Sequence, residues 1–178
     1  MSKALPSREQ AIELLKKNHC SPHVISHCIV VTEISLEICS QLKKKGFDLD
    51  RGLVEAGALL HDIGRSKSND VDHGVVGAQI AEQEGLPETV ADIIRKHVGG
   101  GFTAEEAAEL GWPVGDYMPT NLEEKVVSYA DKLVDNSKRK RVPISFEVER
   151  LKAKGHIKAA ERVEKLHEEL SAMLGDQA

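Results

Sequence analysis

The sequence has few cysteines, and their pattern excludes two classes of small scaffold. Among 178 residues there are three, all in the first quarter of the chain: Cys20, Cys28 and Cys39. An odd number without a Cys-x-x-Cys pair provides neither a disulfide framework nor the paired thiolates of a zinc ribbon. We therefore expect free thiols and a reducing, cytoplasmic location.

Long apolar runs and an excess of basic charge are also missing. No stretch approaches the ~20 apolar residues of a membrane span, and the first residues form no signal-like apolar segment. The net charge is −5, with acidic and basic residues mixed along the chain. This mixture argues against a dedicated nucleic-acid surface but leaves a nucleotide open as a substrate. The sequence favours a protein that has no membrane partner and acts on a small molecule.

What the chain does have is helical periodicity. No segment shows sustained strand alternation, so we predict an all-α fold. A chain of this length can bury its own core as a single domain, residues 1–178. A C-terminal helical extension is predicted at about 145–175. The predicted helices cover about residues 8–18, 22–45, 51–62, 73–84, 87–97, 104–110, 121–134, 146–152 and 156–174.

Polar residues with helix-capping chemistry precede most of these segments. Serine, threonine and aspartate side chains accept hydrogen bonds from the first backbone N–H groups of a helix. A glutamate or glutamine three residues later completes a capping box. The predicted N-caps are Ser7, Ser21, Asp50, Asp72, Thr103 and Thr120. The four basic residues at 138–141 are predicted to be solvated charge at a helix end.

Four ionisable residues occupy apolar helical positions on three segments: His27, His61, Asp62 and Asp131. Burying such groups is costly unless they are paired or bind a metal ion. Adjacent side chains on a helix diverge by ~100°, so His61 and Asp62 can reach one ion only where their helix ends. Gly64 provides that end. Mixed nitrogen and oxygen donors favour iron, manganese, cobalt or zinc over calcium, so the pattern predicts a metal centre and therefore an enzyme.

The segments around these residues resemble the HD-domain metal-dependent phosphohydrolases, and the HDIG subgroup in particular. The motif Leu-Leu-His-Asp-Ile-Gly at 59–64 is followed by Asp-His-Gly-Val-Val-Gly-Ala at 72–78 and Ile-Arg-Lys-His at 94–97. The resemblance covers about residues 20–135 and implies an HD-domain helical bundle. It also adds His73 and His97 as metal ligands.

The resemblance implies one or two divalent ions, of iron, manganese, cobalt, nickel, zinc or magnesium. In a two-metal centre Asp62 would bridge, with His27, His61 and Asp131 on one ion and His73 and His97 on the other. His61 and Asp62 are the implied catalytic residues. Spacing in the sequence does not itself define this partition.

The implied reaction is hydrolysis of a phosphate ester or anhydride, with a nucleotide as the favoured substrate and a metal-activated water as the nucleophile. Phosphomonoesters, phosphodiesters and dinucleoside polyphosphates all remain open. Four basic residues near the predicted ligands are candidates for binding substrate phosphate: Arg65, Lys67, Lys96 and Lys132.

Other interpretations remain open. The same ligands would suit an HD-type diiron oxygenase, and a regulatory HD module would bind a nucleotide without turnover. His73 could simply lie in the first turn of a helix, and His97 could complement a helix dipole. The final helix could pack on the domain or on a second copy, so both a monomer and a homodimer are compatible with the sequence.

Overall fold

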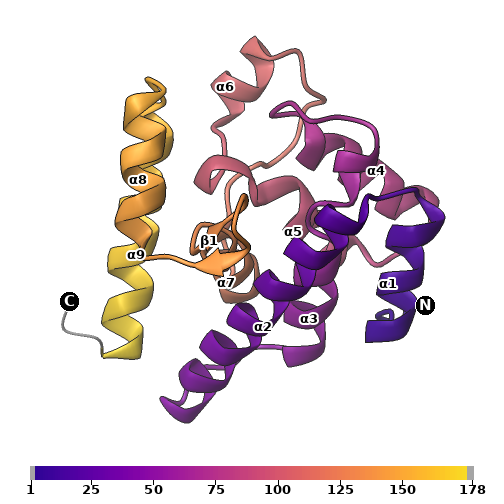
Figure 1. The fold of residues 1–178 in the computed structure, drawn as a ribbon, viewed down its shortest axis with the longest axis horizontal. Helices are drawn as coiled ribbons and strands as arrows, with labels where there is room; N and C mark the ends of the chain where they lie inside the picture. Colours follow the sequence, from indigo (N-terminus) through magenta and orange to yellow (C-terminus); the bar gives the residue numbers. More distant parts are fainter. Residues whose placement is uncertain (1–2, 176–178) are drawn as a thin grey trace.

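The computed structural model describes residues 3–175, and helices dominate them, so the predicted all-α class is confirmed (Figure 1). Two short 3-10 turns, η1 (Ile63–Ser66) and η2 (Val98–Gly100), follow α3 and α5. The α-helices are α1 (Arg8–Lys17), α2 (Pro22–Lys44), α3 (Arg51–Leu60), α4 (His73–Gln83), α5 (Glu88–Lys96), α6 (Ala104–Glu109), α7 (Leu122–Asp131), α8 (Ile144–Ala153) and α9 (Ile157–Leu174).

Helix α2 is the central helix of the core. It packs on α3 and α7, and ten of its residues are buried. By length and hydropathy alone α2 is apolar enough to cross a membrane, which the sequence analysis did not anticipate. Half of its most apolar window is nevertheless buried against other helices, the pattern of a core helix. Its buried face carries His27 toward the ends of α3 and α7.

Most of the predicted helix starts are confirmed, but two caps are wrong. Ser7 and Thr103 form capping boxes, and the Ser21 and Asp50 side chains also cap their helices. The Asp72 carboxylate makes no capping bond and instead accepts a hydrogen bond from the Ser68 hydroxyl. The capping box of α7 begins one residue later than predicted. The side chains that form it are those of Asn121 and Glu124, and Thr120 only donates to the Glu124 carboxylate.

A short hairpin replaces the predicted C-terminal end of helix 121–134. Helix α7 stops at Asp131, and strands β1 (Val134–Asp135) and β2 (Lys140–Arg141) pair antiparallel. The Asp135 carboxylate accepts hydrogen bonds from the Ser137 hydroxyl and from the backbone N–H groups of Ser137 and Lys138, which favours a turn over a helix. The basic run 138–141 therefore lies in a hairpin, and its prediction as a helix end is wrong.

Helices α8 and α9 form an antiparallel pair at one side of the protein (Figure 1). Helix α8 begins two residues earlier than predicted and packs on α9 through a small apolar cluster. Further along α9, Leu166 and Leu170 join the main core. The C-terminal helix α9 thus packs on α7 and α2 of the same chain.

The three thiols are predicted to resist modification in the folded protein. All are buried, and burial raises the pKa of Cys20 to about 11. Because the thiolate is the reactive form, labelling by a thiol reagent near pH 8 should be slower than for the unfolded chain by about 100-fold or more. A time course with and without denaturant measures this ratio. Rapid labelling of any one cysteine in the native protein would contradict the buried positions.

Candidate metal centre

The His61-Asp62 doublet lies in a tight turn between α3 and α4. Helix α3 ends at Leu60, and the chain then turns through η1. Gly64 in this turn touches the start of α4, because a β-carbon there would stand 1.9 Å from the His73 carbonyl oxygen. Only a residue without a side chain allows this approach. The glycine therefore brings His73 next to the doublet.

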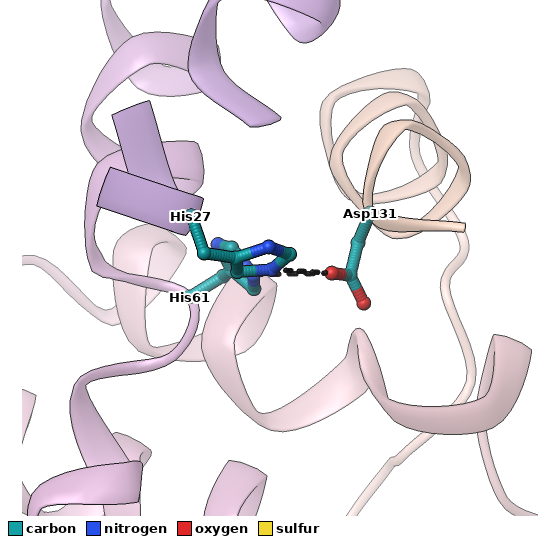
Figure 2. A group of neighbouring side chains, drawn as sticks. All are labelled: His27, His61 and Asp131. Carbon is teal, nitrogen blue, oxygen red and sulfur yellow. Dashed lines mark hydrogen bonds and ion pairs between the residues drawn. The ribbon is translucent and has the colours of Figure 1, made fainter. Parts of the chain in front are cut away.

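One group of ligand-type atoms faces a single carboxylate oxygen. His27 from α2 and His61 from the end of α3 point toward Asp131 of α7, which lies opposite them (Figure 2). The His27 Nε2 atom is 3.0 Å from Asp131 Oδ1, and His61 Nε2 is 3.4 Å from the same oxygen. Asp62 Oδ2 completes the group, at 3.5 Å from His27 Nε2 and 3.6 Å from His61 Nε2.

A second group faces the other oxygen of Asp62. The Nε2 atoms of His73 and His97 each lie 3.3 Å from Asp62 Oδ1. The two Nε2 atoms are only 3.1 Å apart. Asp62 is thus shared by the two groups, with one carboxylate oxygen toward each, and His61 also lies within 4.8 Å of ligand-type atoms of Asp62 and His97.

Hydrogen bonds to the backbone set the tautomer of three of these histidines. The Nδ1 atoms of His61, His73 and His97 each lie 2.7 Å from the carbonyl oxygen of the residue three positions earlier. A carbonyl oxygen only accepts, so each Nδ1 donates its proton. The neutral form of each ring then presents an unprotonated Nε2 to the centre. This arrangement is typical of metal-ligating histidines.

The electrostatics keep both carboxylates charged and His97 neutral. Burial alone would raise the pKa of Asp62 and of Asp131, but neighbouring positive charges and hydrogen-bond donors outweigh it and hold both pKa values well below the usual range. These are chiefly His61 beside Asp62 and Lys132 beside Asp131. Burial lowers the pKa of His97 to about 4. Charged carboxylates and neutral imidazoles are the forms that bind a cation.

The donor set fits a divalent cation better than it fits a network of hydrogen bonds. When both rings are neutral and hold a proton on Nδ1, His73 and His97 turn lone pairs toward each other and toward Asp62 Oδ1, an arrangement that a cation between them would stabilise. His61 Nε2 is buried and has no hydrogen-bond partner among the residues that the structure describes. Nitrogen and carboxylate oxygen donors in this mixture suit first-row transition metals.

A family model for the HD domain matches residues 24–135, most of the chain. The chain belongs to the HD-domain family. An uncharacterized protein of Methanocaldococcus jannaschii is 42% identical over 167 residues, which cover 93% of this chain and 98% of the relative. A tRNA (cytidine(56)-2'-O)-methyltransferase of Picrophilus torridus is 38% identical over 97% of this chain. The chain spans only about half of that protein, 49% of its length.

Solved HD domains share the fold. The HD domain of the L. monocytogenes phosphodiesterase PgpH, in a complex with cyclic-di-AMP, superimposes with a TM-score of 0.57. The match covers 90% of this chain and 96% of the PgpH domain, at 16% sequence identity. The predicted family and helical bundle are therefore confirmed.

The four predicted phosphate-binding cations of this HD domain lie in different environments. Arg65 contacts the doublet, with its Nε 3.2 Å from Asp62 Oδ2, and Lys67 is exposed nearby on the same turn. The buried Lys96 ammonium instead donates to Glu124 at 3.0 Å. The buried Lys132 ammonium donates to Asp131 Oδ2 at 2.7 Å and to the His97 carbonyl at 3.1 Å. Lys96 and Lys132 are therefore engaged by the protein itself.

Two residues that hold the surroundings of the site in place were not identified from the sequence. The Ser128 hydroxyl donates to the His97 carbonyl at 3.1 Å, beside Lys132, so α7 holds the backbone of this histidine from two positions. Glu124 is the buried partner of Lys96 and also caps α7. The capping box at 121–124 is visible in the sequence and was missed by one residue. Ser128 lies one turn before Lys132 on α7, but its contact with a distant loop leaves no pattern in the sequence.

Metal binding by this centre is predicted to release a proton. Burial lowers the pKa of His61, but the Asp62 charge outweighs it and raises that pKa well above 6.5 in the metal-free protein. This pairing stabilises the metal-free fold below about pH 6.5, and the contribution is lost as the pH rises through the raised value. A cation must displace the His61 proton. We expect about one proton released per chain near pH 7, with affinity increasing toward pH 8.

Isothermal titration with Mn²⁺ in two buffers of different ionisation enthalpy measures the proton count. His61→Gln should bind metal weakly and release fewer protons than the wild type. Tight wild-type binding with no proton release, and with equal affinity at pH 6 and pH 8, would contradict the assignment of His61 as a ligand.

Proposed function

We propose that this HD domain is a metal-dependent phosphohydrolase that cleaves a phosphodiester bond in a nucleotide substrate. The observation that carries the proposal is the position of Asp62, with one oxygen toward His27 and His61 and the other toward His73 and His97. A carboxylate shared in this way is suited to two cations. Two neighbouring cations lower the pKa of a water molecule and balance the charge on phosphate oxygens during in-line displacement.

The protein residues prepare this centre in three ways. The carbonyl groups three residues before His61, His73 and His97 orient the imidazoles. Lys132 binds Asp131 Oδ2 and thereby directs Oδ1 toward His27 and His61. These contacts fix the ligands before a substrate arrives, so little reorganisation is needed during the reaction.

Arg65 is the proposed phosphate-binding residue. Its guanidinium lies beside Asp62 Oδ2 and its side chain is 28% exposed, so it can contact Asp62 and still face a substrate. Guanidinium groups pair with phosphate oxygens through two parallel hydrogen bonds. Lys67 adds positive charge on the same turn. The buried Lys96 is proposed to anchor the loop before α7 through Glu124 and Asp116 rather than to bind phosphate.

Two comparisons support a nucleotide as the substrate class. The PgpH domain with this fold is described as a phosphodiesterase and in complex with cyclic-di-AMP. The Picrophilus torridus relative is named as a tRNA methyltransferase, so a domain of this kind occurs in a protein named for an RNA substrate. Cyclic dinucleotides and RNA phosphodiesters share the same linkage, and both belong in the first substrate panel.

The test is hydrolysis by protein reconstituted separately with Mn²⁺ and with Fe²⁺ under anaerobic conditions. The panel comprises bis(p-nitrophenyl) phosphate, p-nitrophenyl phosphate, cyclic dinucleotides, 2',3'-cyclic nucleotides, short RNA and dinucleoside polyphosphates. The proposal expects turnover of diesters that exceeds turnover of monoesters. Arg65→Gln should raise KM for the diester with little loss of bound metal.

Three results would contradict the proposal, each in favour of a different function. Oxygen consumption by the iron-loaded protein without phosphate chemistry would identify an oxygenase. Tight nucleotide binding by metal-loaded protein that turns over nothing in the panel would identify a regulatory module. A preference for dinucleoside polyphosphates would support a phosphohydrolase activity but contradict a phosphodiester as its substrate.

A further inference from the structure

The basic run 138–141, at the hairpin that follows Asp131, has no role in the chemistry described above. Its charge is unusual in a chain with a net charge of −5. Lys138, Arg139 and Lys140 are exposed, and none of their side chains forms a close ion pair among residues 3–175. The Ser137 hydroxyl and, to a smaller extent, the Lys138 charge lower the pKa of the nearby Asp135 carboxyl. Only Arg141 is neutralised, by an ion pair with Glu37 of α2. Three adjacent cations are therefore available to an anionic ligand.

This hairpin follows Asp131, the side chain at the most exposed edge of the candidate metal centre. Of the six ligand-type side chains, Asp131 is 16% exposed, whereas the other five are at most 6% exposed. Strand β1 begins three residues after Asp131. The Arg139 guanidinium reaches back across this edge to α2, where its Nη1 lies 3.5 Å from Ser26 Oγ, one residue before His27. The cations thus lie on a hairpin that follows Asp131 and that contacts the residue before His27.

The turn that carries the cations is already ordered. The Asp135 carboxylate binds the Ser137 and Lys138 backbone, and the Arg139 N–H donates to the Asp135 carbonyl at 2.7 Å. Arg139 has a φ of +51°, a left-handed conformation that is uncommon for arginine. Such a conformation persists where surrounding contacts impose it, and it is frequent at functional sites.

An exposed aromatic side chain follows the hairpin in the chain. Phe146 is 43% exposed and is the third residue of α8, five residues after Arg141. It shares a helix face with Arg150, four residues later, whose guanidinium pairs with the Glu147 carboxylate through two hydrogen bonds. Basic side chains combined with exposed aromatic rings are typical of surfaces that bind single-stranded nucleic acid.

We propose that the basic hairpin, defined as Lys138, Arg139 and Lys140, binds the phosphates of a single-stranded polynucleotide on either side of the bond at the metal centre. The inference rests on the proposed function and names its substrate class. Asp62 is almost completely buried, so a phosphate must enter a recess to reach it. A flexible single strand can bend into such a recess, whereas a stiff duplex cannot.

The test is binding of a fluorescein-labelled single-stranded RNA of about 12 nucleotides, measured by anisotropy with the Asp62→Asn protein so that the probe stays intact. The hairpin variant combines Lys138→Gln, Arg139→Asn and Lys140→Gln, because asparagine tolerates a positive φ. A matched control combines Lys43→Gln, Lys44→Gln and Lys45→Gln. This second basic run lies at the opposite end of α2 from His27.

The proposal expects the hairpin variant to lose about ten-fold in affinity, and the slope of log K against log salt to fall by about 2 for three lost phosphate contacts. The lysine control should change neither. Equal binding by the hairpin variant and the lysine control, or no binding of the RNA by the parent protein, would overturn it. Hydrolysis of bis(p-nitrophenyl) phosphate, with the same substitutions in the wild-type background, is measured in parallel. RNA binding that does not depend on the hairpin, with this activity intact, rejects only the inference. Absence of this activity in the wild type rejects the proposed function.

Discussion

Asp62→Asn is expected to lower metal-dependent phosphodiester hydrolysis by about 10³-fold or more, the effect of losing several kcal/mol of transition-state stabilisation. An asparagine side chain has nearly the same shape as aspartate but only one oxygen. Its amide nitrogen would donate to the Nε2 atoms on one side of the centre, where the carboxylate now faces histidines from two directions. A bridging position is thereby lost while the fold is kept. Initial rates with bis(p-nitrophenyl) phosphate measure the effect.

Asp48→Asn provides the matched control for this substitution. Asp48 is exposed and lies in the loop before α3, away from the metal centre, so its loss should leave the rate unchanged. The thermal transition of both variants should stay close to that of the wild type. An Asp62→Asn protein that is folded and retains a tenth or more of the wild-type rate would contradict a bridging role.

Gly64→Ala is expected to cause the largest loss of stability among single substitutions near the site. The added β-carbon would stand 1.9 Å from the His73 carbonyl oxygen and 2.7 Å from the Gly77 backbone nitrogen. Both neighbours are backbone atoms of α4, so the helix itself must shift. We expect a cost of about 3 kcal/mol or more in the free energy of unfolding, and a fall of about 6–12 °C in Tm for a chain of this size. Metal affinity should fall as well, since α4 carries His73.

Gly52→Ala offers a contrasting substitution within α3. Gly52 is exposed near the start of this helix, and a β-carbon there would meet only side-chain atoms, at 3.3 Å or more. Alanine is a better helix former than glycine, so this variant should unfold at the same temperature or slightly higher. Thermal unfolding followed by circular dichroism compares the two. Equal transitions for Gly64→Ala and the wild type would mean that α4 does not pack on the doublet as the structure describes.

Much of the fold followed from local signals. Capping boxes at Ser7 and Thr103, and N-caps at Ser21 and Asp50, set helix starts through short-range hydrogen bonds that a sequence pattern contains. The hairpin at 134–141 did not follow, because its turn depends on the Asp135 carboxylate binding backbone groups rather than on hydrophobic periodicity. The helical pattern of apolar residues continues to Val134, so the sequence did not indicate this hairpin.

The sequence predicted which residues gather at the candidate site, but it did not predict the roles of the lysines. Four ionisable residues at apolar positions pointed to one buried cluster, and the family resemblance added His73 and His97. The structure brings all six residues together. The roles of the lysines could not be predicted, because the sequence shows that Lys96 and Lys132 adjoin ligand candidates but does not show which way their side chains turn. Lys132 points to Asp131 and to a loop carbonyl 35 residues away in the chain.

The proposed site binds two cations through Asp62, and the number of metal ions bound per chain tests this most directly. Apoprotein loaded with Mn²⁺ and separated from free metal is analysed by inductively coupled plasma mass spectrometry, alongside His27→Ala and His73→Ala. His23→Ala is the control, an exposed histidine on α2 one turn before His27. We expect two ions per chain in the wild type and in His23→Ala, and one ion in each of His27→Ala and His73→Ala. One ion or none in the wild type, or two retained in both ligand variants, would contradict it.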